Sequence, residues 1–418
     1  MAESLPTDHA PLDYSSPVPR SLLLNITGVD RPGVTSTLFS CLPNEIRVLD
    51  VEQVVVQGLL TLGVLVALEP RTDVDGLMES VELKLGALGM QVSSAISESE
   101  EVLTNHRQTV TVLGSPLEAH AFSKLATAIA EAGANIDRIE RIASYPVTAI
   151  ELSVSGAQLL PLRERLALLA SASGMDVAVQ QGGINRRGRQ LVVMDVDSTV
   201  IQDEVVELLA RHAGVEDRVR EITSRAMAGE LDFESSLRER VALLAGLSES
   251  VFAEVYQELR LTPGARTLCR VLTSLGYHVA LVSGGFTQVV TPLGESLGVD
   301  HTRANELEVI DGVLTGKILG DIVDRAGKAK ALVELAQEHD IPLSRTVAVG
   351  DGANDLDMLA VAGLGIAFNA KPVVRSAADA AVNVPYLDTV LYLLGISREE
   401  VEEFDAQSGI DHNYPTVD

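Results

Sequence analysis

The sequence predicts an α/β protein in which two βαββαβ ferredoxin-like units precede a doubly wound parallel sheet with a helical cap. Two stretches near the N-terminus share one order of apolar and helical segments, and later apolar runs alternate with helical patterns. Such alternation is typical of a parallel sheet covered by helices on both faces. A chain of 418 residues is also too long for one ordinary core. We therefore expect several domains.

The first unit spans residues 21–98. An apolar run at 22–26 leads into the turn Gly28-Val29-Asp30-Arg31-Pro32-Gly33 and then into an apparent helix. Two β-branched runs separated by Gly58 follow, and then a helical segment and a short strand at 90–94. The predicted order is βαββαβ.

The second unit spans residues 107–181 and repeats this order. It begins with a strand at 109–113, continues with a helix at 119–132 and ends in another apolar run. Both units resemble the ACT domain, a small amino-acid-sensing module. The first unit carries the Gly-x-Asp-Arg-Pro-Gly turn of that family, whereas the second has only Gly114-Ser115-Pro116 there.

The rest of the chain divides by composition. Residues 182–190 are rich in glycine and arginine and have no periodicity, which predicts a linker. A third domain follows at 191–397, and its segment 215–261 has helical pattern only, which predicts an inserted cap over the active site. Residues 1–20 are predicted to be a flexible tail and residues 398–418 an acidic tail.

Composition narrows the function classes and the compartment. The formal net charge of -27 disfavours nucleic acid as a partner, because a phosphate backbone would be repelled. Two cysteines, Cys41 and Cys269, cannot form a disulfide framework, so a reducing cytoplasm fits best. The first residues do not resemble a signal peptide. The most apolar stretch, 59–68, is far shorter than the roughly 20 residues of a membrane helix, so we expect no membrane partner.

Two aspartates give the strongest chemical signal. Asp195 and Asp197 follow the apolar run 191–194 with one residue between them. Residues i and i+2 begin on one face of a strand, so the two carboxylates can converge at its end. They would offer oxygen ligands to Mg²⁺, and one could attack while the other transfers protons. Taken alone, Asp-x-Asp is more often a turn that caps a helix.

Three further motifs follow in the chain. Ser283 and Gly284 end the apolar run 278–282, and their hydroxyl and backbone N–H groups can approach phosphate oxygens. Lys328 lies at a helix start and can offset phosphoryl charge, although Lys330 is a rival and a solvated lysine is commoner.

The last motif is an acidic loop spaced by glycines after a third apolar run. It contains Asp351, Asn354 and Asp355, and it is suited to completing a Mg²⁺ shell. Each motif alone could be a plain turn or a capped helix. Their occurrence in one order, mostly at predicted strand ends, favours a shared site.

This constellation resembles the phosphatases of the haloacid dehalogenase superfamily, and within them the phosphoserine phosphatase family. The resemblance implies that Asp195 is the nucleophile that accepts the phosphoryl group and that Asp197 is the acid/base. It also implies that Ser283 and Lys328 hold phosphoryl oxygens. Mg²⁺ would be bound by the Asp195 carboxylate, the Asp197 backbone carbonyl and Asp351, within a shell ordered by Asn354 and Asp355.

The same resemblance implies a pocket for O-phospho-L-serine. Glu204 and Arg240 match the residues that hold the amine and the carboxylate, and Met227 and Phe233 would line the pocket beside Gly284 and Asn354. Without the resemblance, Glu204 would be a helix-dipole partner and Arg240 part of a surface ion pair.

Two other hypotheses stay open. Phosphohomoserine or phosphothreonine, as substrates of a phosphatase or phosphotransferase, differ by only a methylene or methyl group in the pocket. Alternatively, the chain is an amino-acid sensor that uses its phosphatase domain as a phospho-switch or to bind a partner.

The ACT-like units suggest feedback regulation by L-serine through a homodimer, at the end of serine biosynthesis. In that family small amino acids bind between paired modules near the first turn, here around Gly28, Asp30, Arg31 and Gly33. Alternatively, the glycines only satisfy a tight turn and the units only dimerise.

Overall fold

The computed structural model describes residues 20–409 except 70–71, 98–106, 184–185, 187, 189 and 228–229. The predicted N-terminal tail up to residue 19 lies outside the described residues. The chain forms two compact units, Met1–Leu103 and Thr104–Asp418. Within the described part of the chain, no helix has both the length and the apolar character needed to cross a membrane.

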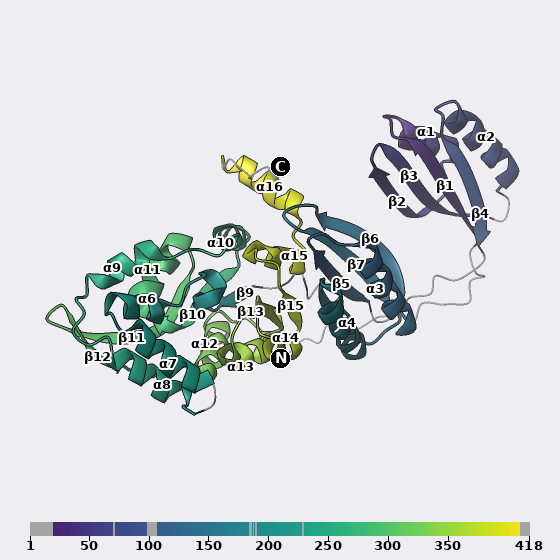
Figure 1. The fold of residues 1–418 in the computed structure, drawn as a ribbon. Coiled ribbons are helices and arrows are strands. Elements are labelled where there is room, and N and C mark those ends of the chain that lie inside the picture. Colours follow the sequence, from purple (N-terminus) through teal and green to yellow (C-terminus); the bar gives the residue numbers. More distant parts are fainter. Residues whose placement is uncertain are drawn as a thin grey trace, which may run out of the picture. The chain divides into compact units, whose positions relative to one another are not determined.

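The first unit is a four-stranded antiparallel sheet with two helices on one face (Figure 1). The strand order is β2-β3-β1-β4. Alternate β1 residues, Leu22, Leu24 and Ile26, are fully buried and pack against both helices. The elements are β1 (Ser21–Val29), α1 (Val34–Cys41), β2 (Val48–Val56), β3 (Leu59–Ala67), α2 (Val74–Gly86) and β4 (Gln91–Ser97). Their order is the predicted βαββαβ.

The second compact unit, Thr104–Asp418, contains an eleven-stranded mixed sheet among its described residues. The strand order is β12-β11-β10-β9-β13-β14-β15-β8-β5-β7-β6. Six strands that are neighbours in this order, β11, β10, β9, β13, β14 and β15, pair in parallel. The strands are β5 (Gln108–Gly114), β6 (Asn135–Ala143), β7 (Thr148–Ser155), β8 (Asp176–Gln181), β9 (Leu191–Met194), β10 (His278–Phe286), β11 (His301–Ile310), β12 (Val313–Leu319), β13 (Thr346–Gly350), β14 (Leu364–Phe368) and β15 (Ala380–Val382).

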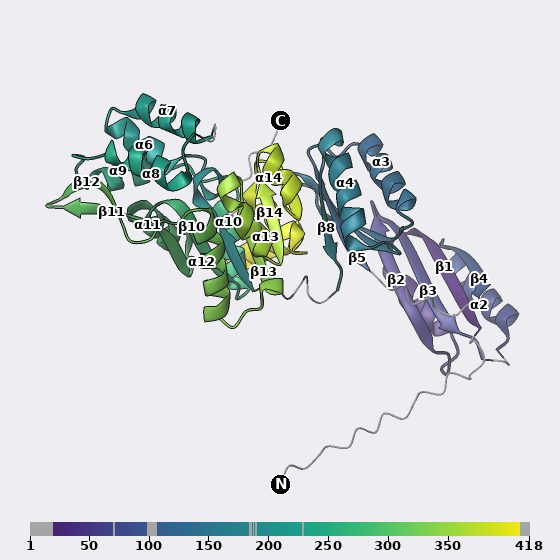
Figure 2. The ribbon, with the colours of Figure 1, turned by 90° about the horizontal axis from the view of Figure 1, so that it is seen from below.

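Helices cover both faces of the parallel core, as predicted for a doubly wound sheet (Figure 2). Consecutive β9 residues face opposite sides: Leu191 and Val193 pack with one set of helices, and Val192 and Met194 with the other. Helices α12 (Arg325–Glu338), α13 (Leu356–Val361) and α14 (Pro372–Ala377) lie on the first side, and α6 (Val205–His212), α10 (Ala265–Ser274) and α11 (Thr287–Leu297) on the second.

The segment predicted as the cap contains α7 (Glu216–Met227), α8 (Phe233–Ala242) and α9 (Val251–Glu258). Helix α8 begins after Asp232, whose side chain accepts a hydrogen bond from the Ser235 backbone N–H. Helices α3 (Ala119–Glu131) and α4 (Leu159–Ser173) cover the second βαββαβ unit, and α15 (Val390–Leu393) and α16 (Arg398–Gln407) end the described chain. Helix α16 therefore occupies part of the predicted acidic tail.

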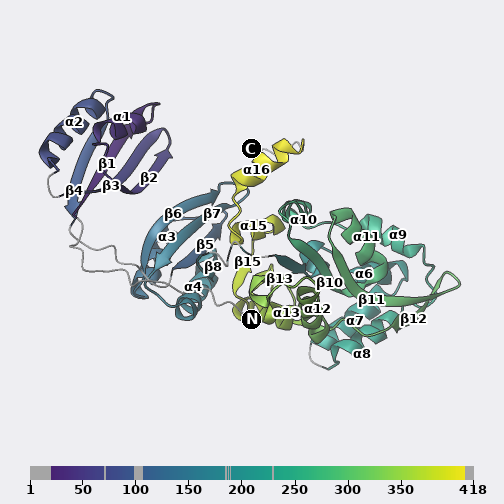
Figure 3. The same ribbon diagram turned by 180° about the vertical axis from the view of Figure 1, so that it is seen from behind.

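The second βαββαβ unit joins the parallel sheet edge to edge. Strands β8 and β15 lie side by side and pair at Ala178 and Ala380 (Figure 3). Arg186, which lies in the predicted linker, is 6% exposed and donates to the backbone carbonyls of Tyr392 and Leu393, both at 3.2 Å. It also forms an ion pair with Glu151 at 2.7 Å. These contacts fix the two parts of the sheet to each other.

Candidate active site

The carboxyl ends of three adjacent parallel strands bring the predicted site together. Asp195 follows β9, Ser283 lies near the end of β10, and Asp351 follows β13. Strand β9 pairs with both neighbours, and the backbone N–H of Asp195 donates to the Val349 carbonyl at 2.9 Å. Because these strand ends lie at one edge of the sheet, residues far apart in the sequence meet there.

Lys328 is the buried cation of the site. Its side chain is 0% exposed, and its Nζ lies 2.7 Å from Asp195 Oδ1 and 2.7 Å from Asp355 Oδ1. Burial alone would lower the pKa of Lys328, but the two carboxylates outweigh it and raise that pKa. Lys330 is 70% exposed and pairs with Glu334 at 3.7 Å. Of the two lysines, the structure brings Lys328 to the aspartates.

Asp195, Asp351 and Asp355 form a buried acidic cluster in which one carboxylate oxygen from each lies within 4.8 Å of the others. Burial raises the pKa of Asp195 well above its usual range, and burial together with Asp355 raises the pKa of Asp351 to about 6. Asp355 also accepts a hydrogen bond from the Gly352 backbone N–H at 2.9 Å. Clustered carboxylate oxygens are the donor set that a hard divalent cation requires, so these residues fit Mg²⁺.

Asp197 lies beside this cluster in different surroundings. Its Oδ1 accepts a hydrogen bond from the backbone N–H of Val205 at 3.0 Å. Burial, together with the negative charge of Glu204, raises the pKa of Asp197 to about 7. A carboxyl group with such a pKa can both donate and accept a proton near neutral pH.

The loop after β10 holds a buried hydroxyl and two closely packed glycines. Ser283 is 0% exposed, and its Oγ accepts a hydrogen bond from Gly285 N at 2.8 Å. A Cβ atom at Gly285 would lie 3.0 Å from Ser283 Oγ and 3.1 Å from Asp197 Oδ2, and one at Gly284 would lie 3.1 Å from Phe233 Cζ. Side chains at these positions would therefore crowd the site.

Asn305 supports this loop and was not predicted from the sequence. It is 1% exposed, and its Nδ2 donates to the Gly284 carbonyl at 2.8 Å. Its Oδ1 accepts from the backbone N–H of Val323 at 2.8 Å. One side chain thus ties the glycine loop to the segment that leads into α12. An asparagine within a β-strand was the only signal available.

A cavity of about 630 Å³ opens above the acidic cluster. The predicted residues that line it are Asp195, Asp197, Glu204, Phe233, Gly284, Arg240, Asp351 and Asn354. The Met227 side chain lies outside the described residues. Thr223, Arg325 and Lys371 also line the cavity and were missed. Neither basic residue belongs to a recognisable motif, although Arg325 lies in the first turn of the helix that carries Lys328.

Glu204 and Arg240 place one acid and one base in this cavity. Glu204 Oε1 accepts from Ser198 Oγ at 2.9 Å, and Arg240 Nε donates to the Ser236 carbonyl at 3.3 Å. Burial raises the pKa of Glu204 and lowers that of Arg240, while the charge of each residue opposes the shift of the other. Burial removes water from both charged groups. A ligand ammonium would therefore complement Glu204, and a ligand carboxylate would complement Arg240.

The predicted regulatory residues lie in the turn between β1 and α1. Gly33 has φ 97°, a left-handed conformation that favours glycine. A Cβ atom at Gly28 would lie 2.7 Å from Met90 Sδ, so a side chain here would displace the end of the Met90 side chain. The side chains of Asp30 and Arg31 are exposed. Backbone geometry accounts for Gly33 and packing beside Met90 for Gly28, whereas the charged side chains are available to a ligand.

Comparisons with known proteins assign three stretches of the chain to families. Residues 192–360 match the haloacid dehalogenase-like hydrolase family, and residues 20–95 and 106–180 each match an ACT domain family. The chain is 57% identical over 394 residues to the phosphoserine phosphatase of Streptomyces coelicolor, covering 94% of this chain and 96% of that protein. It is 48% identical over 396 residues to that of Mycobacterium tuberculosis, covering 93% of this chain and 97% of that one.

Solved structures agree with this assignment. The unliganded probable phosphoserine phosphatase of Vibrio cholerae has a TM-score of 0.56 and 36% identity, covering 71% of this chain and 88% of that one. A haloacid dehalogenase family hydrolase of Salmonella enterica serovar Typhi has a TM-score of 0.62 and 30% identity, covering 69% and 98%. The resemblance predicted from the motifs is confirmed: the chain belongs to the phosphoserine phosphatase family of haloacid dehalogenase-like hydrolases, with two ACT domains before the hydrolase domain.

Proposed function

We propose that the chain hydrolyses O-phospho-L-serine to L-serine and phosphate through an aspartyl-phosphate intermediate on Asp195. The observation that carries the proposal is the contact of buried Lys328 with Asp195, beside the acidic cluster and below a cavity that offers an acid and a base. Phosphoryl transfer needs an aligned nucleophile, neutralised phosphoryl oxygens and a protonated leaving group. The named residues supply each of these.

The reaction has two steps. In the first, an Asp195 carboxylate oxygen bonds to phosphorus, the bond from phosphorus to the serine oxygen breaks, and Asp197 gives its proton to that oxygen. In the second, Asp197 takes a proton from water, the water oxygen bonds to phosphorus, and the bond to Asp195 breaks. The pKa of about 7 for Asp197 suits a group that must donate and then accept. Lys328, Ser283 and the Gly284 backbone N–H would hold the phosphoryl oxygens.

Mg²⁺ would be held by the Asp195 carboxylate, the Asp197 backbone carbonyl and Asp351. When bound, it neutralises charge on the phosphoryl group and on the carboxylates around it. The charge balance supports this, because the one positive charge of Lys328 meets a cluster of three carboxylates, two of them buried and in contact with it, before any phosphate arrives. Asp355 is held by Lys328 and Gly352, so it would order the shell together with Asn354.

The substrate assignment depends on the two charged groups in the cavity. Glu204 would bind the ammonium of phosphoserine and Arg240 its carboxylate, with Phe233 and Met227 against the carbon chain. Phosphothreonine and phosphohomoserine present the same charged groups. Discrimination by a methyl or methylene is worth only about 1–3 kcal/mol, so relative turnover of the three substrates decides between them.

If the chain is only a sensor, an assay of phosphate release should give a different result. A chain that only senses amino acids or binds a partner would release little phosphate from any phosphomonoester. The buried contacts of Lys328 favour catalysis, because a buried charge network is costly to keep.

We also propose that L-serine inhibits the enzyme through the ACT domains of a homodimer. The exposed Asp30 and Arg31 would bind its ammonium and carboxylate. Dimerisation is supported by β2, an edge strand whose Val54, Val55 and Val56 are 54%, 44% and 62% exposed. An apolar edge strand exposes unpaired backbone groups that a second copy of β2 can satisfy. Loss of dimers in Val55→Lys, measured by light scattering, would support this interface.

The first experiment measures phosphate release from L-phosphoserine with Mg²⁺, with and without EDTA. We expect turnover to require the metal, to disappear in Asp195→Asn and to persist in Lys330→Met, the exposed control. Titration with L-serine should lower turnover in the wild type and not in Asp30→Asn. If other phosphomonoesters are hydrolysed and phosphoserine is not, the proposed mechanism stands and the substrate assignment is wrong. Full turnover by Asp197→Asn would overturn the assigned proton donor.

A further inference from the structure

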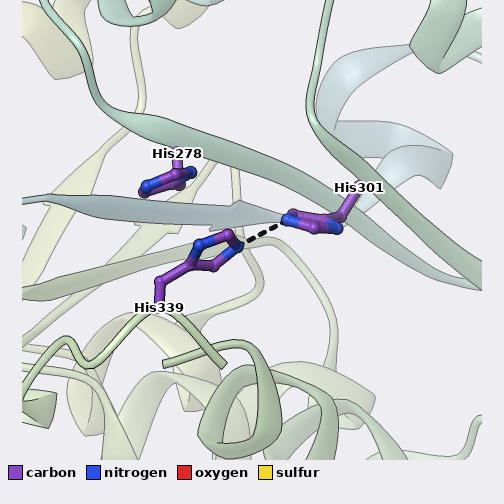
Figure 4. Close-up of side chains that lie close together, drawn as sticks. All are labelled: His278, His301 and His339. Carbon is purple, nitrogen blue, oxygen red and sulfur yellow. Dashed lines mark hydrogen bonds between the residues drawn. The ribbon is translucent and has the colours of Figure 1, made fainter. Parts of the chain in front are cut away.

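Three histidines form a cluster away from the active site. His278 begins β10, His301 begins β11, and His339 follows the last residue of α12. Figure 4 shows the three side chains gathered at one place. One ring nitrogen of each lies within 4.8 Å of the others. All are half-buried. Three imidazoles from separate elements are therefore brought to one point by the fold.

The geometry leaves a nitrogen lone pair inside the cluster. His301 Nε2 and His339 Nε2 lie 2.7 Å apart, so one donates a hydrogen bond and the other accepts it without a proton of its own. The His278 ring stacks on that of His339, with centroids 3.8 Å apart and 22° between the planes. The rings of His301 and His339 thus face each other through ligating atoms, and the His278 ring stacks on His339.

We propose that His278, His301 and His339 bind a divalent transition metal such as Zn²⁺ or Ni²⁺. Imidazole nitrogen suits these ions, whereas Mg²⁺ prefers oxygen. Binding would replace the shared proton between His301 and His339, which would be released to solvent. With metal–nitrogen bonds of about 2.0–2.1 Å and tetrahedral angles, two ligand nitrogens lie about 3.3 Å apart. The facing nitrogens must therefore separate by about 0.6 Å, and the His278 ring must rotate out of its stack.

The histidine site is distinct from the catalytic centre. His278 and His301 lie at the amino ends of parallel strands, whereas Ser283 and the aspartates lie at the carboxyl ends. Between His278 and Ser283 the strand spans about 17 Å. The metal would join the C-terminal end of α12 to β10 and β11, and α12 carries Lys328 near its other end. It would therefore stabilise the domain without touching the substrate.

The test uses the full chain without an affinity tag, in an Asp351→Asn background that weakens the acidic cluster. Calorimetric titration with Zn²⁺ and the visible absorption of bound Co²⁺ report the histidine site. In that background we expect about one equivalent of Zn²⁺, a tetrahedral Co²⁺ spectrum and a rise in Tm with Zn²⁺, all lost in His301→Gln and His339→Gln. The matched control is His120→Gln, which removes an exposed histidine of α3 and should change nothing.

Two further measurements keep the result interpretable. In the wild-type background, phosphoserine turnover with Mg²⁺ should be unchanged in both histidine variants, which shows that they fold. X-ray absorption of the Asp351→Asn chain with one equivalent of Zn²⁺ should show imidazole nitrogens at about 2.0 Å from the metal. This measurement needs no histidine variant. Unchanged Zn²⁺ stoichiometry in His301→Gln and His339→Gln, or a zinc shell of oxygen atoms only, would overturn the proposal.

Discussion

Replacement of Lys328 by methionine tests the buried charge network directly. The change keeps most of the side-chain volume but removes a charge that is 2.7 Å from both Asp195 and Asp355. Two buried carboxylates then lack their partner. Breaking a buried ion pair by removing one member costs about 3–5 kcal/mol, so we expect a loss of this size in the free energy of unfolding at pH 8 in EDTA.

The cost should depend on pH, because the carboxylates can protonate. Without the lysine charge, the pKa of Asp195, which burial already raises, rises further in the folded chain. The folded state then binds more protons than the unfolded state from about pH 4 upward to the raised pKa, so stability falls as pH rises. The deficit of Lys328→Met should accordingly be smaller at pH 5 than at pH 8.

Urea unfolding followed by far-UV circular dichroism measures the effect, since the chain has no tryptophan. The relevant transition is that of the second compact unit. Lys330→Met, the same change at a side chain that is 70% exposed, serves as the control and should stay within about 0.5 kcal/mol of the wild type. If Lys328→Met costs no more than this control at pH 8, or costs the same at pH 5 and pH 8, the reasoning is refuted.

Three further predictions concern crowding, the sheet junction and titration. Gly285→Ala should lower kcat by about tenfold or more without unfolding the chain, because the new methyl group lies 3.1 Å from Asp197 Oδ2; unchanged turnover would contradict this. Arg186→Met should destabilise the second compact unit by about 3 kcal/mol in urea unfolding, because Glu151 loses its ion-pair partner and two backbone carbonyls each lose one hydrogen bond; a change below about 0.5 kcal/mol would contradict it. Without metal, the free energy of unfolding should fall from about pH 5 to pH 7. Burial raises the pKa of Asp197 to about 7 and that of Asp351 to about 6, so over this range the folded state holds protons that the unfolded state has released. Thermal unfolding in EDTA checks this, and Mg²⁺ should flatten the profile; stability that rises over this range would be the contrary result.

The fold class could be predicted because its signals are local. Apolar runs separated by helical patterns predicted the parallel core, and two matching orders of elements predicted both ACT-like units. The hairpin of β11 and β12 was not predicted, because its residues mix polar and apolar types without a clean period. The junction of β8 with β15 joins segments about two hundred residues apart, and nothing in either segment indicates the other.

The positions of candidate site residues at strand ends could be predicted from the apolar runs before them, and those of supporting residues could not. Asn305 takes its partners from Gly284 and Val323, which lie 21 and 18 positions away. Arg186 lies within a glycine-rich segment, yet its partners Tyr392 and Leu393 are 206 and 207 positions away. Hydrogen bonds between such distant groups depend on tertiary packing, which propensity and periodicity do not encode.

The choice between Lys328 and Lys330 could have been made from the sequence. Residues on one face of a helix recur at i, i+3, i+4 and i+7, and the apolar residues Ala331, Leu332 and Leu335 stand at these intervals from Lys328. Lys330 is in phase with Glu334 on the outer face, where it forms an i,i+4 pair. A lysine in phase with an apolar stripe points toward the core, and an ammonium that is buried there needs carboxylate partners. The periodicity of α12 therefore indicated that Lys328 faces the sheet, and the structure shows that its partners there are Asp195 and Asp355.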